Sequence, residues 1–338
     1  MKHDKILLGH GSGGKLSHDL ITGLFLKYFG RHHNEFLGDS TILDSHGRDL
    51  AFSTDSFVVD PIFFPGGDIG KLAVCGTVND IAVSGAKPLY LSASFILEEG
   101  LSSNDLERII ISMAEEAERS GVKIVTGDTK VVDKGKCDKI FINTTGIGFF
   151  SDGKRDYYSG NSIQPGDKVI INGPVGDHGM AVMASRKNLN FSASIKSDCA
   201  SLNGLIQDVL DSSEGIRFMR DATRGGLATV LCEVCGGKEW GVELEEESLP
   251  LNEQVKGMCE ILGFDPVYVA NEGKVVIITE QNEGERVLEI LRNHELGKEA
   301  KIIGQITEDH NGKVILNTAI GGRRIIDMLA GEQLPRIC

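Results

Sequence analysis

Five aspartates of this 338-residue chain stand in short contexts that are turn-like or flanked by glycine. They are Asp39 in LGDST, Asp55 in FSTDSF, Asp80 in GTVNDIA, Asp128 in TGDTK and Asp221 in MRDATRGG. Mg²⁺ takes carboxylate oxygens as ligands and commonly bridges them to substrate phosphates. If these side chains converge, the chain can hold a nucleotide through a divalent cation. Taken one at a time, each aspartate is more readily explained as a turn or cap residue.

Two further segments could contact phosphate. The run GHGSGGK, residues 9–15, has enough glycine for backbone N–H groups to surround a phosphate, although it could equally be a plain loop. It is not a P-loop, because Leu16 follows Lys15 where that motif needs serine or threonine. Lys130 follows Asp128 and Thr129, and its ammonium could pair with a phosphate or, if desolvated, act as a base. A solvated loop lysine is the alternative.

Two residues could act directly on a reacting group. Glu272 in ANEGK precedes an expected strand from Lys274, where a carboxylate can be a positioned general base, although a surface glutamate is the simpler explanation. Cys338 is the last residue, so its thiol could be carried on a swinging arm and react as the thiolate. The alternative is a terminal cysteine without function.

Other candidates favour structural roles. Cys232 and Cys235 form CEVC, but no second CxxC exists and both fall on an expected amphipathic helix, which favours core packing over a zinc half-site. His178 in GDHG could contact a ligand or make a loop hydrogen bond.

The first half of the chain reads as alternating strands and helices. A strand over residues 50–59 carries Asp55, and a helix follows within residues 67–86, with an apolar face and a second face bearing Asp80. Asn104 is expected to cap the next helix, which Gly121 ends. A strand over residues 123–126 then delivers a polar loop at 127–130, and another strand follows.

The second half repeats this mixture after a polar stretch, so a domain boundary is expected near residues 155–165. Helices are expected around residues 202–210 and 227–234, and a strand over 274–279. The pattern indicates an α/β or α+β fold. The residues from Gly321 onward show no strong period and are expected to form a tail.

Composition excludes several classes of protein. The formal net charge of −14 disfavours binding to nucleic acid or to an anionic membrane surface. The uncharged stretch IFINTTGIGFFS is too short to span a bilayer, and the N-terminus lacks the pattern of a secretion signal. Seven scattered cysteines fit reduced thiols, and therefore a cytoplasmic protein.

Together these motifs resemble the hydrogenase maturation protein HypE family, within the wider PurM-like group of ATP-using enzymes. The shared segments include GTVNDIAVSGA, TGDTKVV, GDHG, DATRGG, NEGK and the terminal PRIC, which is the discriminating one. The resemblance implies a PurM-like architecture with domains at 1–155 and 160–320, a mobile tail at 321–338, and a homodimer around a β-barrel-like core. It also implies ATP and Mg²⁺ as cofactors.

The activity that the resemblance implies is synthesis of cyanide ligands for nickel-iron hydrogenase. A carbamoyltransferase, HypF, would load a carbamoyl group on Cys338, ATP would drive its dehydration to a thiocyanate, and a HypC–HypD complex would accept the cyanide.

The resemblance also assigns roles to individual residues. Those expected to hold Mg²⁺ are Asp39, Asp55, Asp80 and Asp221, with Asp128 as a neighbour. Those expected to contact the nucleotide are Asn79, Gly127, Asp128, Thr129 and Lys130. Glu272 and Lys130 are the expected catalytic groups for proton removal, and Cys338 carries the substrate.

Two alternatives remain at this stage. A carrier that only presents the thiol of Cys338 would have no need of the aspartates. A different PurM-like enzyme is the other alternative, but selenophosphate synthetase would normally carry a reactive cysteine in the N-terminal glycine-rich loop, and GHGSGGK has none. A purine-pathway synthetase would have no use for a terminal thiol.

Overall fold

The structure is a computed structural model, and it describes residues 14–25, 39–44, 49–150, 156–186, 195–329, 334 and 336–338. Most of the glycine-rich run at residues 9–15 therefore lies outside the described residues. Within those ranges, no helix combines the length and the apolar character needed to cross a membrane.

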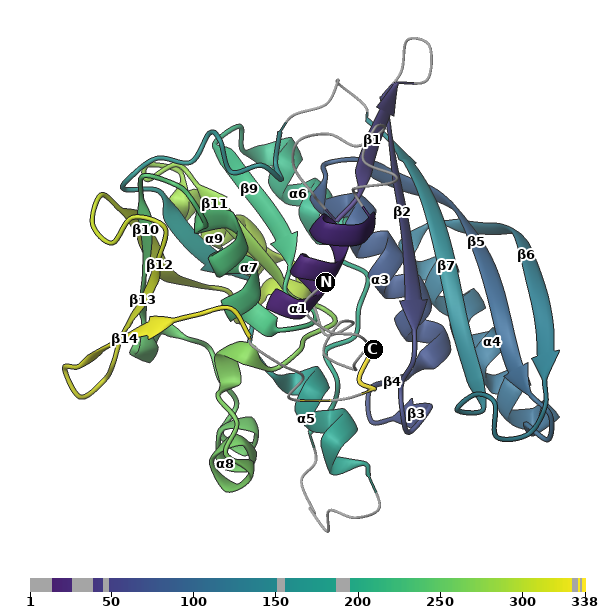
Figure 1. The fold of residues 1–338 in the computed structure, drawn as a ribbon. Helices are drawn as coiled ribbons and strands as arrows, with labels where there is room; N and C mark the ends of the chain where they lie inside the picture. Colours follow the sequence, from purple (N-terminus) through teal and green to yellow (C-terminus); the bar gives the residue numbers. More distant parts are fainter. Residues whose placement is uncertain are drawn as a thin grey trace.

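The N-terminal half forms a five-stranded sheet in the order β1-β2-β7-β5-β6, covered on one face by two helices (Figure 1). The strands are β1 (Thr41–Asp44), β2 (Asp49–Phe57), β5 (Lys87–Glu98), β6 (Lys123–Val132) and β7 (Ile140–Phe149), and the helices are α3 (Ile69–Val83) and α4 (Ser103–Ser120). Only β5 and β6 pair in parallel, because α4 forms the crossover between them. Short elements flank this layer: α1 (Lys15–Leu20), the π-helical turn η2 (Ile21–Phe25), β3 (Phe63–Phe64) and β4 (Gly67–Asp68).

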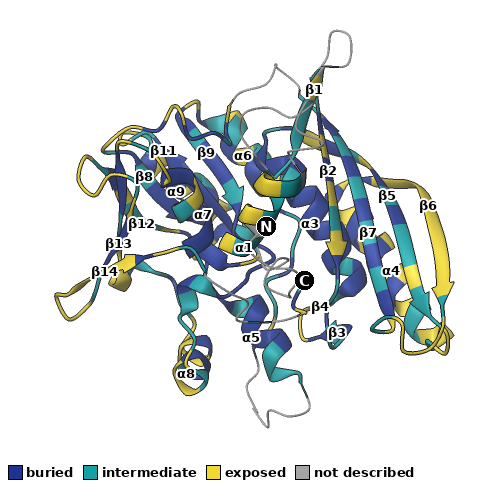
Figure 2. Cartoon of the chain, in the orientation of Figure 1, coloured by how far each residue is buried: buried dark blue, intermediate teal, exposed yellow. Residues whose placement is uncertain are grey.

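Helix α3 is buried on nearly all sides, as Figure 2 shows. The second face, which bears Asp80, lies inside the molecule, because α3 is placed between the N-terminal sheet and elements of the second domain. It packs very close to β7, where a Cβ on Gly146 would lie 2.5 Å from Cδ1 of Ile81. Asp68 caps the N-terminus by accepting from the backbone N–H groups of Gly70 and Lys71.

Two local predictions in this domain are wrong. Helix α4 is capped by Ser102, whose hydroxyl accepts from the N–H of Asp105, and not by Asn104. Gly121 ends it in the left-handed conformation, as expected. Residues 127–130 are not a loop but the middle of β6, because β6 pairs with β5 along its whole length. Hydrogen bonding to a neighbouring strand outweighs the weak strand propensity of Gly127 and Asp128.

The C-terminal half forms a seven-stranded sheet in the order β14-β13-β10-β12-β8-β11-β9. The strands are β8 (Lys168–Ile171), β9 (Ile216–Asp221), β10 (Gly241–Glu245), β11 (Val275–Thr279), β12 (Lys301–Thr307), β13 (Val314–Asn317) and β14 (Arg323–Ile326). Side chains alternate across the fully buried β11, so Val276 and Ile278 face α7 while Val275 and Ile277 face α6 and α9. The helices are α5 (Asp177–Ala184), α6 (Asn203–Ser212), α7 (Gly226–Cys235), α8 (Glu253–Leu262) and α9 (Gly284–Asn293).

The C-terminal segment differs from the expected tail. Residues 323–326 form β14, an edge strand of the second sheet, so the extended segment begins only after Ile326. The last residues then return to the N-terminal domain, where Ile337 is buried and Cys338 packs against the same apolar cluster. Figure 1 shows the C-terminus beside β4, between the two domains.

Candidate active site

The four aspartates expected to hold a metal lie close together where the two domains meet. Asp55 comes from β2, Asp80 from α3 and Asp221 from the end of β9. The hydroxyl of Ser53 links two parts of the group by donating to Oδ2 of Asp80 at 2.5 Å and to the carbonyl of Asp39 at 3.1 Å. Strand β2 and helix α3 pack together, so the N-terminal fold places three carboxylates against a fourth from the second domain.

Burial of so much negative charge shifts the proton affinities in this cluster. Desolvation raises the pKa of Asp80 and Asp221 well above the ordinary value, and the neighbouring carboxylates raise both further. Burial likewise raises the pKa of Asp55, although Arg224 opposes the shift. The described residues therefore leave a site with excess negative charge, which a divalent cation would neutralise.

The geometry suits Mg²⁺ held together with phosphates more than a metal caged by protein alone. Among the described residues, no group of three acid, histidine or cysteine side chains is already arranged as a metal cage. Mg²⁺ is typically held through one or two carboxylates, with water and substrate phosphates completing the shell. Several carboxylates near one another at the domain boundary fit that mode of binding.

Two arginines balance part of the negative charge. Nε of Arg220 lies 2.7 Å from Oδ1 of Asp39, and its Nη1 lies 2.7 Å from Glu233. Nη2 of Arg224 lies 3.6 Å from Oδ1 of Asp55. Arg224 stands in DATRGG, but no sequence pattern selects it, because nothing local shows that it faces β2 of the other domain.

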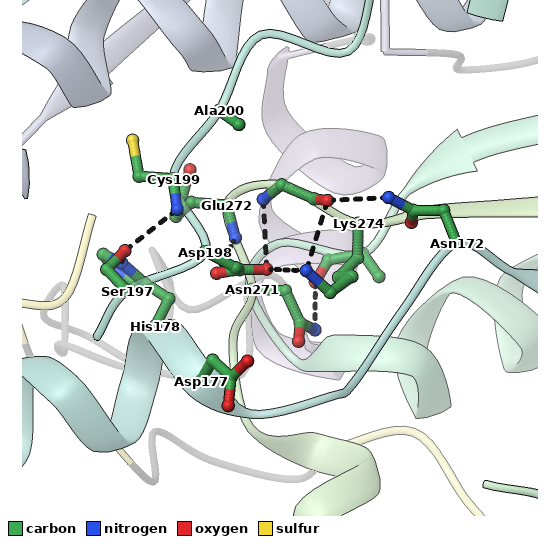
Figure 3. Close-up of polar contacts among 12 residues, drawn as sticks. Asn172, Asp177, His178, Ser197, Asp198, Cys199, Ala200, Asn271, Glu272 and Lys274 are labelled. Carbon is green, nitrogen blue, oxygen red and sulfur yellow. Dashed lines mark hydrogen bonds and ion pairs between the residues drawn. The ribbon is translucent and has the colours of Figure 1, made fainter. Parts of the chain in front are cut away.

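Glu272 is buried on the loop before β11 and is positioned by an ion pair behind it. Its backbone N–H donates to Oδ1 of Asp198 at 3.1 Å, and the N–H of Gly273 donates to Oδ2 at 3.2 Å. Nζ of Lys274 lies 2.9 Å from the same Oδ2 (Figure 3). Desolvation raises the pKa of Glu272 well above normal, as do Asp221 and Asp198. Asp198 and Lys274 were not selected from the sequence.

Cys338 lies at this same site. Burial raises the pKa of its thiol, Glu272 forms a side-chain hydrogen bond with it, and the charge of Arg224 works in the opposite direction. The thiol is therefore protonated in this position. The structure brings together the terminal cysteine, the expected base and the acid cluster, three features far apart in sequence.

Asn79 has a different setting from the one expected. Its Nδ2 donates to the carbonyl of Ala200 at 3.1 Å, and its Oδ1 accepts from the N–H of Leu202 at 2.7 Å. The side chain is buried. The oxygen and the nitrogen of the amide thus both bond to the backbone of the segment after residue 199. In this arrangement Asn79 joins α3 to that segment of the second domain.

The residues from Gly127 to Lys130 are not brought to the cluster within one chain. They lie on β6, an exposed edge strand. Asp55, Thr144, Ala93 and Gly127 are aligned across β2, β7, β5 and β6. Three strand spacings of about 4.8 Å separate Gly127 from Asp55 by roughly 14 Å.

The cysteines of CEVC pack as expected. Sγ of Cys232 donates to the carbonyl of Ile326 at 3.3 Å, and Cys235 is buried in the core between α7 and the second sheet. Burial raises the pKa of Cys232 to about 12 and that of Cys235 to about 11.

Comparison with known proteins identifies the class. Residues 38–150 match the N-terminal domain of the AIR synthase related proteins, and residues 164–317 match their C-terminal domain. A two-domain protein of this class thus carries the acid cluster between its domains.

Individual relatives define the family within this class. The carbamoyl dehydratase HypE of Rhodobacter capsulatus is 48% identical over 100% of this chain and 99% of its own. A crystal structure of the hydrogenase maturation protein HypE in complex with ATP is 48% identical, covers 99% of this chain and 100% of that one, and superposes with a TM-score of 0.81. A HypE–HypF complex gives 49% identity, a TM-score of 0.86, and coverage of 92% and 99%. The chain belongs to the HypE family.

Asp80→Asn is expected to stabilise the metal-free protein at neutral pH. Because burial raises the pKa of Asp80 in the folded chain, its contribution to stability is fullest below the unfolded value of about 4 and falls as the pH rises through the folded value. Asparagine keeps an acceptor for Ser53 without the charge. Thermal unfolding in EDTA should show a rise of a few degrees at pH 8 that shrinks toward pH 5.

Asp208→Asn, an exposed change on α6, serves as the control and should not alter the unfolding temperature. The charge balance described for this site would be contradicted if Asp80→Asn lowered the unfolding temperature at pH 8. It would also be contradicted if the variant raised the unfolding temperature equally at every pH.

Proposed function

We propose that the chain dehydrates a carbamoyl group carried on Cys338 to a thiocyanate at the expense of ATP. The observation that carries this proposal is the position of the terminal thiol beside Glu272 at the edge of a buried acid cluster. Membership of the HypE family, with a relative named carbamoyl dehydratase and a neighbour solved with ATP, supports it. The product would supply the cyanide ligands of nickel-iron hydrogenase.

The chemistry explains why ATP is needed. Converting an S-linked carbamoyl group to a nitrile removes the carbonyl oxygen, and hydroxide is a poor leaving group near neutral pH. Attack of that oxygen on the γ-phosphorus releases ADP and forms a C–O–P linkage. The nitrogen then loses its two protons in total, its electrons form the triple bond, and the C–O bond breaks with both electrons going to departing phosphate. The balance is one ATP consumed, with ADP, phosphate and the thiocyanate formed.

The chain's own residues fit the proton and charge requirements of this sequence. Glu272 lies within hydrogen-bonding reach of the Cys338 thiol, and a buried carboxylate with a raised pKa is a stronger base once ionised. The Asp198–Lys274 pair holds the loop that presents it. Arg224 is near enough to compensate charge on the reacting oxygen.

Mg²⁺ is the metal that the carboxylates fit. Asp39, Asp55, Asp80 and Asp221 would hold it, and when bound it would neutralise charge on the ATP phosphates. The excess negative charge of the described site is the observation in its favour.

A homodimer would complete the site. Apolar side chains on β5 and β6 are exposed in the single chain, among them Tyr90, Ile96, Val125 and Val131 (Figure 2). Pairing two N-terminal sheets would cover them, as in a β-barrel-like core, and would carry the segment from Gly127 to Lys130 toward the nucleotide bound to the other protomer. Lys130 would then contribute to proton removal there.

The proposed partners follow from the same chemistry. HypF, which is seen with HypE in a neighbouring structure, would load the carbamoyl group, and a HypC–HypD complex would accept the cyanide. All seven cysteines are free thiols, which suits the reducing cytoplasm as the location.

Intact-mass analysis tests the enzymatic proposal against a carrier. Carbamoylated protein given Mg²⁺ and ATP should lose the mass of one water, with no loss when ATP is omitted. Cys338→Ala should accept no carbamoyl group and form no thiocyanate, while its ATP affinity stays within about twofold of wild type. Loss of ATP binding in this variant would contradict the separation of tail and nucleotide site. Carbamoylated wild type that keeps its mass with ATP would identify a carrier.

Glu272→Gln tests the base. The glutamine preserves shape but takes no proton, so we expect dehydration to slow by about 100-fold or more, with the carbamoyl group still attached. Glu308→Gln, an exposed change far from the site, should leave the rate unchanged. Turnover at the wild-type rate by Glu272→Gln would remove Glu272 from the mechanism.

Mixed dimers test the contribution of Lys130. We expect Lys130→Ala and Asp80→Asn each to be inactive alone. If Lys130 serves the partner's acid cluster, a heterodimer of the two variants contains one intact site, and random pairing restores about a quarter of wild-type turnover. Light scattering establishes that the mixture is dimeric. A dimeric mixture that stays inactive would place Lys130 in its own protomer's site or outside the mechanism.

A further inference from the structure

His178 is a fully buried histidine at the start of α5 whose two ring nitrogens both have partners. Nε2 lies 2.9 Å from the backbone carbonyl oxygen of Ile337, and Nδ1 lies 2.8 Å from the hydroxyl of Ser197. The ring also meets Phe64 edge-on, with centroids 5.3 Å apart. A segment from the second domain thus contacts the next-to-last residue of the chain.

The partners determine the direction of these hydrogen bonds. A carbonyl oxygen can only accept, so Nε2 must carry the proton and donate to Ile337. Nδ1 is then an acceptor, and the hydroxyl of Ser197 donates to it. The same hydroxyl oxygen accepts from the N–H of Cys199 at 3.1 Å (Figure 3). The neutral imidazole therefore has a single tautomer, and burial favours it by lowering the pKa of His178.

This chain of hydrogen bonds leads to the loop that presents Glu272. Ser197 precedes Asp198, whose carboxylate accepts from the backbone of Glu272 and Gly273 and pairs with Lys274. One short segment thus contacts both the docked tail, through His178, and the proposed base, through Asp198. Figure 3 shows His178, Ser197 and Asp198 on one side of Glu272.

We infer that His178 is a positioning residue that fixes the C-terminal tail by its backbone at residue 337 and so sets Cys338 against Glu272. The backbone carbonyl of Arg336 also accepts from the N–H of Asp60 and from Nη2 of Arg186, both at 3.1 Å, but the bond from His178 acts at residue 337, directly before the thiol. Nη1 of Arg336 lies 2.8 Å from Asp138, but both side chains are about half exposed, and such pairs contribute little. The hydrogen bond from His178 is made to the backbone of residue 337 and does not involve the side chain of Cys338. It can therefore hold the tail whether Cys338 carries a carbamoyl or a cyano group.

A matched pair of substitutions tests the clamp. Asparagine places its amide oxygen where Nδ1 lies, so His178→Asn keeps an acceptor for Ser197 and loses the donor to the tail. Glutamine places its amide nitrogen near Nε2, so His178→Gln keeps the donor to Ile337. A role in filling the core alone would not separate the two variants in this way.

The readout is the rate at which iodoacetamide alkylates Cys338 in the full-length protein, followed by mass spectrometry of the C-terminal peptide. His178→Asn should raise that rate about tenfold, equivalent to ~1.4 kcal/mol of docking free energy. His178→Gln should stay within about threefold of wild type. Free glutathione alkylated in the same reaction provides the reference rate, because Cys137 adjoins Asp138, which pairs with Arg336 of the tail.

The result that overturns the inference is a Cys338 equally protected in wild type and His178→Asn, or equally exposed in both variants. Should the histidine variants fail to fold, as judged by thermal unfolding, Ser197→Ala leaves the ring in place and should expose Cys338 by a smaller factor, about threefold. No change in that variant would also count against the clamp. The role in dehydration rests on the proposed function, whereas alkylation needs neither ATP nor a carbamoyl group, so failure of one is distinguishable from failure of the other.

Discussion

Burial of several carboxylates at one domain boundary is the constraint on which the rest of this structure depends. Asp55, Asp80 and Asp221 all have raised pKa values because desolvation and mutual repulsion act together. Such a cluster is costly unless cations offset it, and the two arginines of the second domain do so only in part. Binding of a cation would remove this repulsion and recover the lost stability, which is the physical basis for the Mg²⁺ site that we propose here.

The position of α3 follows from the same constraint. The helix must bring Asp80 next to β2 while contacting the second domain, so it is enclosed between two layers. The sequence pattern predicted the helix and its apolar residues correctly, but it did not show what the second face packs against. On that face Thr77 forms a buried hydrogen bond to Thr144 at 2.6 Å. Periodicity identifies which residues share a face of a helix, but it cannot tell solvent from a buried polar interface.

The sequence was most informative where a local pattern determines a local structure. Helix α4 ends at Gly121 as expected, and α6, α7 and β11 lie within a residue or two of the predicted ranges. Residues 127–130 and 323–326 were misread because their strand conformation comes from pairing with distant strands. Asp80, Glu272 and Cys338, which stand in distinctive motifs, were predicted to share one site, and they lie near one another in the structure. Arg224, Asp198 and Lys274 were not predicted, because their partners are about 75 residues or more away and no local spacing marks them.

The sulfur of Cys338 has to meet two requirements, loading as a thiolate and dehydration of the group it carries, and its docked position suits only the second. Here the partly exposed thiol lies beside Glu272 and its raised pKa keeps it protonated, so a carbamoyl donor on another protein finds no thiolate. Thiolate formation for loading is therefore favoured when the tail leaves the site, whereas the dehydration proposed beside Glu272 requires the tail to return. Leu334 and Ile337 pack against apolar clusters that exist without the tail, and the clamp at residue 337 acts on backbone. Most of the docking free energy thus comes from contacts that do not involve the reacting group. The same contacts can therefore hold the tail when Cys338 is a free thiol, when it carries a carbamoyl group and when it carries a nitrile.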